Sequence, residues 1–106
     1  MTLVSEPAIS EKDFQTEVLK RAKQFGWMAY HTFDSRRSQK GFPDLILVRG
    51  VVMICLELKS DSKSSKESDE QKAWIKALKG VKIITADFAY PRHLDQVVSA
   101  LSARAR

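Results

Sequence analysis

Apolar side chains recur at helical spacing in the early part of the chain. The positions three or four residues apart are Phe14, Val18, Ala22 and Phe25. Ser10 followed by Asp13 resembles a capping box, which satisfies free backbone amides at a helix start, and Gly26 is a common residue just past a helix end. The pattern predicts an amphipathic helix that begins near Ser10 and ends before Gly26.

Two later segments show the same helical periodicity. The apolar positions of the first segment are Trp74, Ile75 and Leu78. Those of the second segment are Leu94, Val97, Val98 and Leu101. Gly80 ends the first predicted helix, and the second follows Pro91. Arg104 and Arg106 suit the C-terminus of the second helix, because that end of a helix carries a partial negative charge.

Four segments rich in aromatic and β-branched residues are predicted to be strands: 27–33, 44–48, 51–59 and 81–85. Arg49-Gly50 alone separates the second strand from the third, which indicates a tight hairpin. The polar residues between 34 and 42 are expected to form a loop, and those between 60 and 68 a mobile surface segment. The order helix, three strands, helix, strand, helix predicts an α/β domain with one mixed sheet flanked by helices.

Size and charge narrow the possible functions. With 106 residues, of which 43% are hydrophobic, we expect one compact domain over 1–106 with a loose lead-in at 1–9. The net charge of +5 favours a polyanionic partner only modestly, because many basic proteins never meet nucleic acid. No apolar run reaches the ~20 residues that span a bilayer, so no membrane partner is expected. The N-terminus does not resemble a signal peptide, and Cys55 is the single cysteine, so we expect a cytoplasmic, reducing setting.

The residues that carry chemistry are concentrated in Gly41-Phe42-Pro43-Asp44 and Glu57-Leu58-Lys59. Side chains alternate across a strand, so Glu57 and Lys59 project from the same face. If the hairpin pairs the two strands, Asp44 lies near the end of the second strand. Two carboxylates presented together form a hard-oxygen site that Mg²⁺ or Mn²⁺ favours, and such an ion can activate water and polarise a phosphate. The lysine can orient the attacking water, stabilise developing charge or act as a base.

An ordinary solvated strand pair would explain Glu57 and Lys59 equally well if they stood alone. In that interpretation Asp44 simply closes a turn after Pro43. The combination of Gly-x-Pro-Asp with Glu-x-Lys one short hairpin later favours the chemical interpretation.

The ordered set of motifs resembles the VRR-NUC (virus-type replication-repair nuclease) branch of the PD-(D/E)xK nuclease superfamily. The matching pieces are Glu17, Gly41-Phe42-Pro43-Asp44, Glu57-Leu58-Lys59 and Gln71, spread over roughly residues 11–86. The resemblance implies a restriction-endonuclease-like αβββαβ core, to which this chain adds a C-terminal helix. It also implies a metal-dependent endodeoxyribonuclease that uses Mg²⁺ or Mn²⁺.

The resemblance also implies a role for each matching residue. The metal ligands would be Asp44, Glu57 and the backbone carbonyl of Leu58. Lys59 would be the catalytic lysine, Glu17 would reach the metal site directly or through water, and Gln71 would support the site from the second helix. On their residues alone, Glu17 and Gln71 are equally typical of solvated helix positions.

Stand-alone members of this branch are similar to Holliday-junction resolvases and can act as homodimers on four-way DNA. We therefore expect a homodimer and a branched DNA substrate, since two-fold symmetry supplies two symmetric cuts. Arg36, Arg37 and Lys40 precede the motif and can bind the phosphate backbone, although a solvated turn is the alternative. Two other functions stay open: a module that binds nucleic acid without cutting it, and a restriction-type nuclease with sequence preference.

Overall fold

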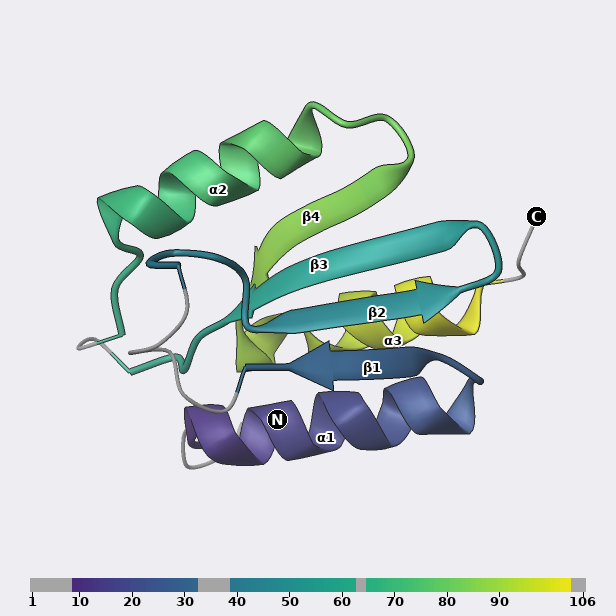
Figure 1. Cartoon of the computed structure of the whole chain (residues 1–106). Coiled ribbons are helices and arrows are strands. Elements are labelled where there is room, and N and C mark those ends of the chain that lie inside the picture. The colour runs from purple at the N-terminus through teal and green to yellow at the C-terminus, as the bar shows by residue number, and fades with distance from the viewer. Residues whose placement is uncertain (1–8, 33–38, 63–64, 104–106) are drawn as a thin grey trace.

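The computed structural model describes residues 9–32, 39–62 and 65–103. In chain order the elements are α1 (Glu11–Gln24), β1 (Met28–His31), β2 (Leu45–Arg49), β3 (Val52–Leu58), α2 (Asp69–Lys79), β4 (Ile84–Ala89), the 3-10 helix η2 (Pro91–His93) and α3 (Leu94–Ser102). The predicted order of helices and strands is confirmed, including the additional C-terminal helix (Figure 1). Among the described residues, no helix is long and apolar enough to cross a membrane.

The four strands form one mixed sheet in the order β1-β2-β3-β4. The pairs β1–β2 and β2–β3 are antiparallel, whereas β3 and β4 run parallel. Helix α2 makes the crossover that a parallel pair requires. The β2–β3 hairpin turns at Gly50, whose φ of +60° lies in the left-handed region that glycine adopts readily.

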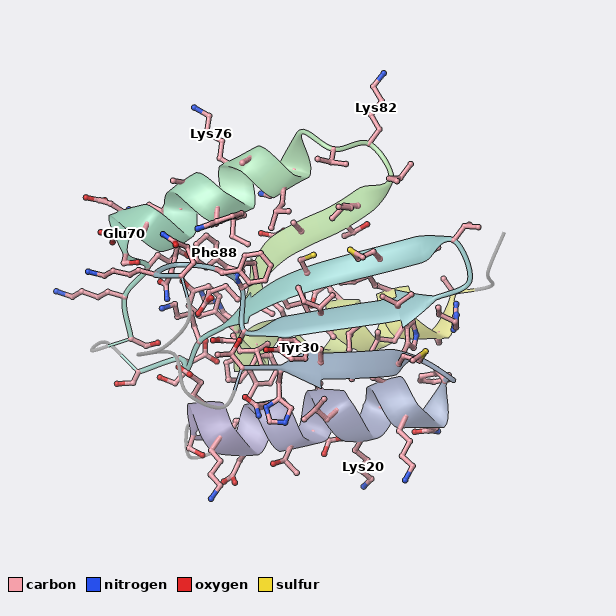
Figure 2. All side chains as sticks on the ribbon, viewed as in Figure 1. Lys20, Tyr30, Glu70, Lys76, Lys82 and Phe88 are labelled. Atoms are coloured by element: carbon pink, nitrogen blue, oxygen red, sulfur yellow. The ribbon has the colours of Figure 1, made fainter. Side chains whose placement is uncertain are left out.

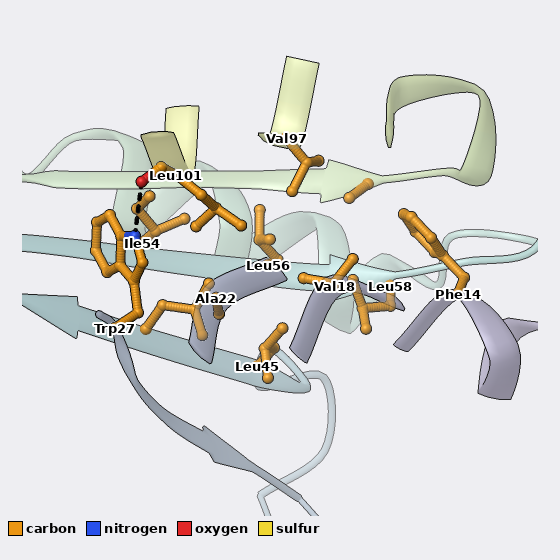
Figure 3. Close-up of a cluster of buried hydrophobic side chains, with 12 residues drawn as sticks. Phe14, Val18, Ala22, Trp27, Leu45, Ile54, Leu56, Leu58, Val97 and Leu101 are labelled. Carbon is orange, nitrogen blue, oxygen red and sulfur yellow. Dashed lines mark hydrogen bonds between the residues drawn. The ribbon is translucent and has the colours of Figure 1, made fainter. Parts of the chain in front are cut away.

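One face of the sheet packs against α1 and α3 and forms the larger core. Figure 3 shows Phe14 and Val18 of α1 together with Leu56 of β3 and Leu101 of α3 in this layer. The indole nitrogen of Trp27 donates a hydrogen bond of 2.9 Å to the Leu101 carbonyl oxygen, so the buried ring leaves no unpaired donor. The helical periodicity of the sequence therefore corresponds to real buried faces.

The opposite face of the sheet is covered only in part by α2, which packs mainly against β4. Ile75 of α2 forms a smaller core with Cys55 and Ala86 beneath it. On β1, at the far side of the same face, Met28 and Tyr30 are 77% and 61% exposed. Figure 2 labels Tyr30 on this strand. An apolar strip of the sheet consequently lies open beside α2.

The last strand begins later than the sequence predicts. Strand β4 covers Ile84–Ala89, whereas the pattern of apolar residues placed it at 81–85. The amide of Val81 bonds to the Leu78 carbonyl oxygen at 3.0 Å, and the amide of Ile84 bonds to the Val81 carbonyl oxygen at 3.0 Å, so these residues turn out of α2. Pairing with β3 starts at Ile84, and the polar Asp87 interrupts the apolar pattern of the true strand.

The other boundaries differ less. The first strand, predicted at 27–33, is observed at Met28–His31, and residue 33 lies outside the described residues, as do 1–8 of the expected lead-in. Mobility of the segment 60–68 stays a prediction, and its described residues make specific hydrogen bonds. The Ser60 amide bonds to the Ser65 hydroxyl at 3.1 Å, and the Tyr90 hydroxyl donates to the Glu67 carboxylate at 2.5 Å.

Candidate active site

The strand register brings Asp44 and Glu57 together. Leu45 pairs with Leu56 across β2 and β3, so one step further along sets Asp44 opposite Glu57 on the same face of the sheet. The backbone amide of Leu58 donates to Asp44 Oδ2 at 3.2 Å and fixes that carboxylate. Two carboxylates therefore meet where the hairpin ends.

Glu57 and Lys59 are the buried charged side chains of the described ranges, with exposed fractions of 4% and 7%. Burial, together with the hydrogen bond and negative charge of Asp44, raises the pKa of Glu57 to about 9. Lys59 acts in the opposite direction on the pKa of Glu57, but its effect is smaller. At neutral pH the carboxylate pair therefore retains a proton unless a cation takes its place.

Gln71 links the second helix to this pair. Its Nε2 donates to Glu57 Oε2 at 3.0 Å, while its Oε1 accepts the Ser68 amide at 2.9 Å. The Ser68 hydroxyl in turn accepts the Gln71 amide at 3.1 Å, which completes a capping box at the start of α2. The spacing Ser-x-x-Gln was a sequence signal for this arrangement, and it explains why the Gln71 side chain has one fixed orientation.

The loop before Asp44 is shaped by its contact with α2. Gly41 has a φ of +89°, and a Cβ there would lie 2.6 Å from the backbone carbon of Glu70, so only glycine fits. The ring of Phe42 meets Trp74 edge to face with centroids 5.0 Å apart, and Pro43 is fully buried. The Gly-Phe-Pro part of the motif therefore docks on α2 and presents Asp44 at the sheet end.

Pro43 also affects the backbone of β3. If the β2–β3 register continues by two residues, Pro43 lies opposite Leu58. Proline has no amide hydrogen, so it cannot donate a ladder hydrogen bond to the Leu58 carbonyl oxygen. The proline of the motif leaves that oxygen without its expected strand donor, beside the Asp44 carboxylate that the Leu58 amide contacts.

Glu17 is not brought to the carboxylate pair. Its carboxylate accepts a hydrogen bond of 2.7 Å from Arg21 Nε, and this bond holds the pKa of Glu17 below its usual range. The helix-one residue at the pocket is Glu11, whose pKa is raised by partial burial and by the charge of Asp44. The two glutamates are six residues apart on α1, about 9 Å along the axis and on different sides, so they are not interchangeable.

A pocket of about 560 Å³ opens above the carboxylates. Its walls come from the start of α1, Thr32 beyond β1, the 39–42 loop, β3 and the N-terminus of α2. Lys40 stands exposed at this pocket, 3.7 Å from Glu70, whereas Arg36 and Arg37 lie outside the described residues. A second pocket of about 470 Å³ lies between β4 and α3 and contains none of the predicted site residues.

Lys59 is held by backbone groups on two sides. Its amide donates to the Ala89 carbonyl oxygen at 2.9 Å, and its ammonium donates to the Lys66 carbonyl oxygen at 2.8 Å. Its positive charge offsets part of the rise in the pKa of both Glu57 and Glu11, so Lys59 interacts electrostatically with both acidic groups. Predicted site residues from β2, β3 and α2 thus converge on one pocket.

The donor set is suited to a cation that keeps part of its water shell. In the ranges 9–32, 39–62 and 65–103, no three His, Cys, Asp or Glu side chains are grouped closely enough to enclose a metal ion. Mg²⁺ is commonly bound through one or two carboxylates plus water and phosphate oxygens, rather than in an all-protein cage. The Asp44–Glu57 pair and the Leu58 carbonyl oxygen fit that mode of binding.

This mixed sheet, flanked by helices and with two adjacent carboxylates at the open end of its hairpin, defines a restriction-endonuclease-like α/β domain. The VRR-NUC domain model matches residues 3–89, and the chain belongs to this family of nuclease domains. A solved structure named VRR_NUC domain protein has a similar fold, with a TM-score of 0.64 and 23% sequence identity. The alignment covers 91% of this chain and 88% of that chain. No curated protein matches the chain.

Proposed function

We propose that this protein is a metal-dependent endonuclease that hydrolyses phosphodiester bonds in DNA, with its active site at Asp44, Glu57 and Lys59. The observation that carries the proposal is the buried Glu57 carboxylate, which lies beside the half-buried Asp44 carboxylate and the buried Lys59. Such a pair requires a proton or a cation, because two like charges removed from water destabilise one another. Membership of a nuclease family supports the same reaction class.

Asp44, Glu57 and the Leu58 carbonyl would hold Mg²⁺ or Mn²⁺. The bound ion supplies charge neutralisation at the phosphate and lowers the pKa of a coordinated water. Gln71 keeps the Glu57 carboxylate oriented through its 3.0 Å hydrogen bond. The Lys59 ammonium orients the attacking water or neutralises charge that develops on the phosphate.

We assign the helix-one role to Glu11 instead of Glu17. Glu11 lines the pocket, and the charge of Asp44 contributes to its raised pKa, whereas Glu17 is paired with Arg21. At the pocket wall, Glu11 can accept hydrogen bonds from water held near the carboxylate pair. Glu11→Gln should therefore reduce cleavage more than Glu17→Gln, and the reverse order would contradict the assignment.

The proposed substrate is branched DNA, in particular a four-way junction. The net charge of +5 favours binding to phosphate backbones, and Lys40 lies at the pocket. Arg36 and Arg37 belong to the same proposed DNA-binding loop by sequence. The proposed assembly is a homodimer, in which two active sites make the symmetric cuts that resolve a junction.

The open strip of the sheet supports a second copy of the chain as the partner. Met28 and Tyr30 are apolar or aromatic where a solvated antiparallel sheet would carry polar residues. The strip is uncharged, which suits contact between two chains that each carry +5. Met28→Glu should convert the dimer to a monomer in sedimentation equilibrium, and an unchanged mass would place the interface elsewhere.

The function is tested with end-labelled four-way junction, splayed-arm, duplex and single-stranded DNA. Wild type and Asp44→Asn are compared in Mg²⁺, Mn²⁺ or EDTA. Paired nicks in the junction that require metal and disappear in Asp44→Asn are the expected result. Tight junction binding without product in either metal would instead favour a non-cleaving binding module. Cleavage that depends on the sequence of the junction arms would favour a restriction-type nuclease.

A further inference from the structure

The ammonium of Lys59 is anchored by a segment that lies outside the sheet. Lys59 is 7% exposed, and its Nζ donates to the Lys66 carbonyl oxygen at 2.8 Å. Lys66 belongs to the connection between β3 and α2, so no strand or helix ladder fixes this carbonyl. The position of the Lys59 ammonium therefore depends on what holds that connection in place.

A hydrogen bond beyond the end of β4 holds the connection next to Lys66. The Tyr90 hydroxyl donates to Glu67 Oε2 at 2.5 Å, and Glu67 directly follows Lys66. The hydrogen bond to this carboxylate raises the pKa of Tyr90 to about 12, so the hydroxyl stays protonated as the donor across the physiological range.

A second contact holds the other end of the connection. Arg92 pairs through both its backbone amide and its guanidinium with the Asp61 carboxylate, the amide bond measuring 3.0 Å. The same guanidinium lies 4.1 Å from the centroid of the Tyr90 ring. His93 meets that ring edge to face, and its Nδ1 lies 3.3 Å from the Tyr90 amide, which donates to it. Tyr90 is therefore held in one orientation by its own neighbours.

We propose that Tyr90 and Glu67 are positioning residues, whose mutual hydrogen bond fixes the Lys66 carbonyl and thereby holds the Lys59 ammonium beside the Asp44–Glu57 pair. The proposal deepens the proposed function, because its effect on rate rests on the role of Lys59 there. A lysine side chain has four rotatable carbon bonds, so an anchor at its tip removes freedom that would otherwise reduce alignment. Small displacements of a reacting group can lower rates by as much as about 100-fold.

The first test measures how accessible the Lys59 amine is to a reagent, and it does not depend on cleavage. Purified wild type, Tyr90→Phe and Glu67→Ala react with an amine-acylating reagent, and mass spectrometry follows each lysine over time. The first variant removes the donor of the hydrogen bond and the second removes its acceptor. Lys59 should react several-fold faster in both variants, while Lys20 on the outer side of α1 serves as the internal reference (Figure 2). Equal Lys59 reactivity in folded wild type and variants would overturn the proposal.

The matched control is Asp87→Asn. Asp87 is an exposed carboxylate of β4 that pairs with Lys79 at 3.5 Å and lies outside the site pocket. This variant removes an exposed carboxylate of β4 without touching Glu67, so Lys59 reactivity should match wild type. Glu67→Ala leaves the contacts of the Tyr90 ring with Arg92 and His93 in place, so it separates loss of the Tyr90–Glu67 hydrogen bond from loss of ring packing.

The second test is kinetic. Tyr90→Phe and Glu67→Ala should each lower kcat about 10-fold with KM unchanged, and the double variant should lose no more than either single variant. A raised KM with unchanged kcat, or fully additive losses, would contradict positioning through one shared bond. If wild type cleaves no DNA, the proposed function fails. The acylation result still decides whether the Tyr90–Glu67 hydrogen bond positions Lys59.

Discussion

The two ends of the β2–β3 hairpin both hold charged side chains in confined surroundings, but the groups around the charges differ. At the open end, Asp44 lies beside Glu57 and the pair faces a pocket. At the turn end, Arg49 extends over the Trp27 ring, with its guanidinium carbon 4.5 Å from the ring centroid. The same hairpin thus carries an acidic pair at one end and a structural cation at the other.

Arg49 is matched by backbone acceptors. Its Nη1 donates to the carbonyl oxygens of Phe25 at 3.1 Å and Leu101 at 2.8 Å, and its Nη2 donates to the Ala103 carbonyl oxygen. Carbonyls at a helix C-terminus lack intrahelical donors, so the guanidinium caps α3 and ties it to the sheet. Its Nε alone finds no hydrogen-bond partner within the described residues.

The difference shows why confinement of a charge does not by itself identify an active site. Arg49 is surrounded by backbone acceptors, so its contacts explain it as part of the fold. The Asp44–Glu57 pair places two like groups side by side, and its open side faces a pocket of about 560 Å³. Like charges brought together beside open space are what a metal-assisted reaction uses.

Replacement of a cation by methionine at each end of the hairpin should have the largest and most different effects. Lys59→Met should reduce junction cleavage at least about 100-fold, because it removes a charge aimed at the developing phosphate charge. Junction affinity should change little, since one buried lysine contributes little to phosphate binding. Single-turnover cleavage and a binding titration on the same DNA check this. Retained cleavage would remove Lys59 from the proposed site.

Arg49→Met should have the reverse effect. It removes the donor to the Phe25 and Ala103 carbonyl oxygens, leaves the Leu101 carbonyl with the Trp27 indole as donor, and loses the guanidinium contact with the Trp27 ring. The free energy of unfolding should therefore fall by about 2–4 kcal/mol. Cleavage per folded molecule should stay at the wild-type value. Urea unfolding combined with active-site titration makes the measurement. A stable but inactive Arg49→Met would contradict the division of roles.

Two glycines differ in how closely other atoms pack against them, and one of them lies in the loop before Asp44. Gly41 and Gly26 both have positive φ, but a Cβ at Gly41 would contact the Glu70 backbone at 2.6 Å, whereas a Cβ at Gly26 meets nothing within 4 Å. Gly26→Ala should cost about 1 kcal/mol from backbone strain alone. Gly41→Ala should cost about 1–2 kcal/mol more and also lower cleavage, because Asp44 follows the displaced loop. Equal thermal unfolding of the two variants would contradict the close docking.

The smallest expected effect is a pH dependence of stability without metal. The pKa of Glu57 rises from its ordinary value of 4.5 to about 9 on folding, so the folded state holds a proton that the unfolded chain has released. This stabilisation is complete below pH 4.5 and is lost as pH rises through 9. In that window the free energy of unfolding should fall as pH rises, because the unfolded chain releases the proton at lower pH than the folded state does. Urea unfolding in EDTA at several pH values should show a shallower slope for Glu57→Gln, and identical slopes would contradict the prediction.

The sequence predicted the fold well where apolar periodicity decided it. Phe14 and Val18 marked the buried face of α1. The hairpin was predicted too, but its turn was placed one residue too early at Arg49-Gly50: Arg49 is the last residue of β2 and pairs with Val52, so the turn is Gly50-Val51, and this register sets Asp44 opposite Glu57. The sequence also placed β4 too early because Val81 and Ile83 extend the apolar run, while pairing with β3 begins at Ile84. Which stretch pairs in a parallel sheet is set by tertiary contacts, which local composition does not report.

The candidate site was predicted unevenly for a related reason. Asp44, Glu57 and Gln71 are joined by strand register and a capping box, both of which have sequence signatures. Glu11 was missed because its approach depends on how α1 sits against the end of the sheet. Arg49 was interpreted as a turn residue because its acceptors lie 24 or more positions away in the sequence.

The proposed function requires that the Asp44–Glu57 pair bind the divalent ion. Titration of Mn²⁺ followed by electron paramagnetic resonance tests it directly, with wild type, Asp44→Asn and the surface control Asp87→Asn compared on uncleaved junction DNA in the cold. We expect bound Mn²⁺ in wild type and in Asp87→Asn, and loss of Mn²⁺ binding in Asp44→Asn. Equal Mn²⁺ binding in wild type and Asp44→Asn would contradict the account.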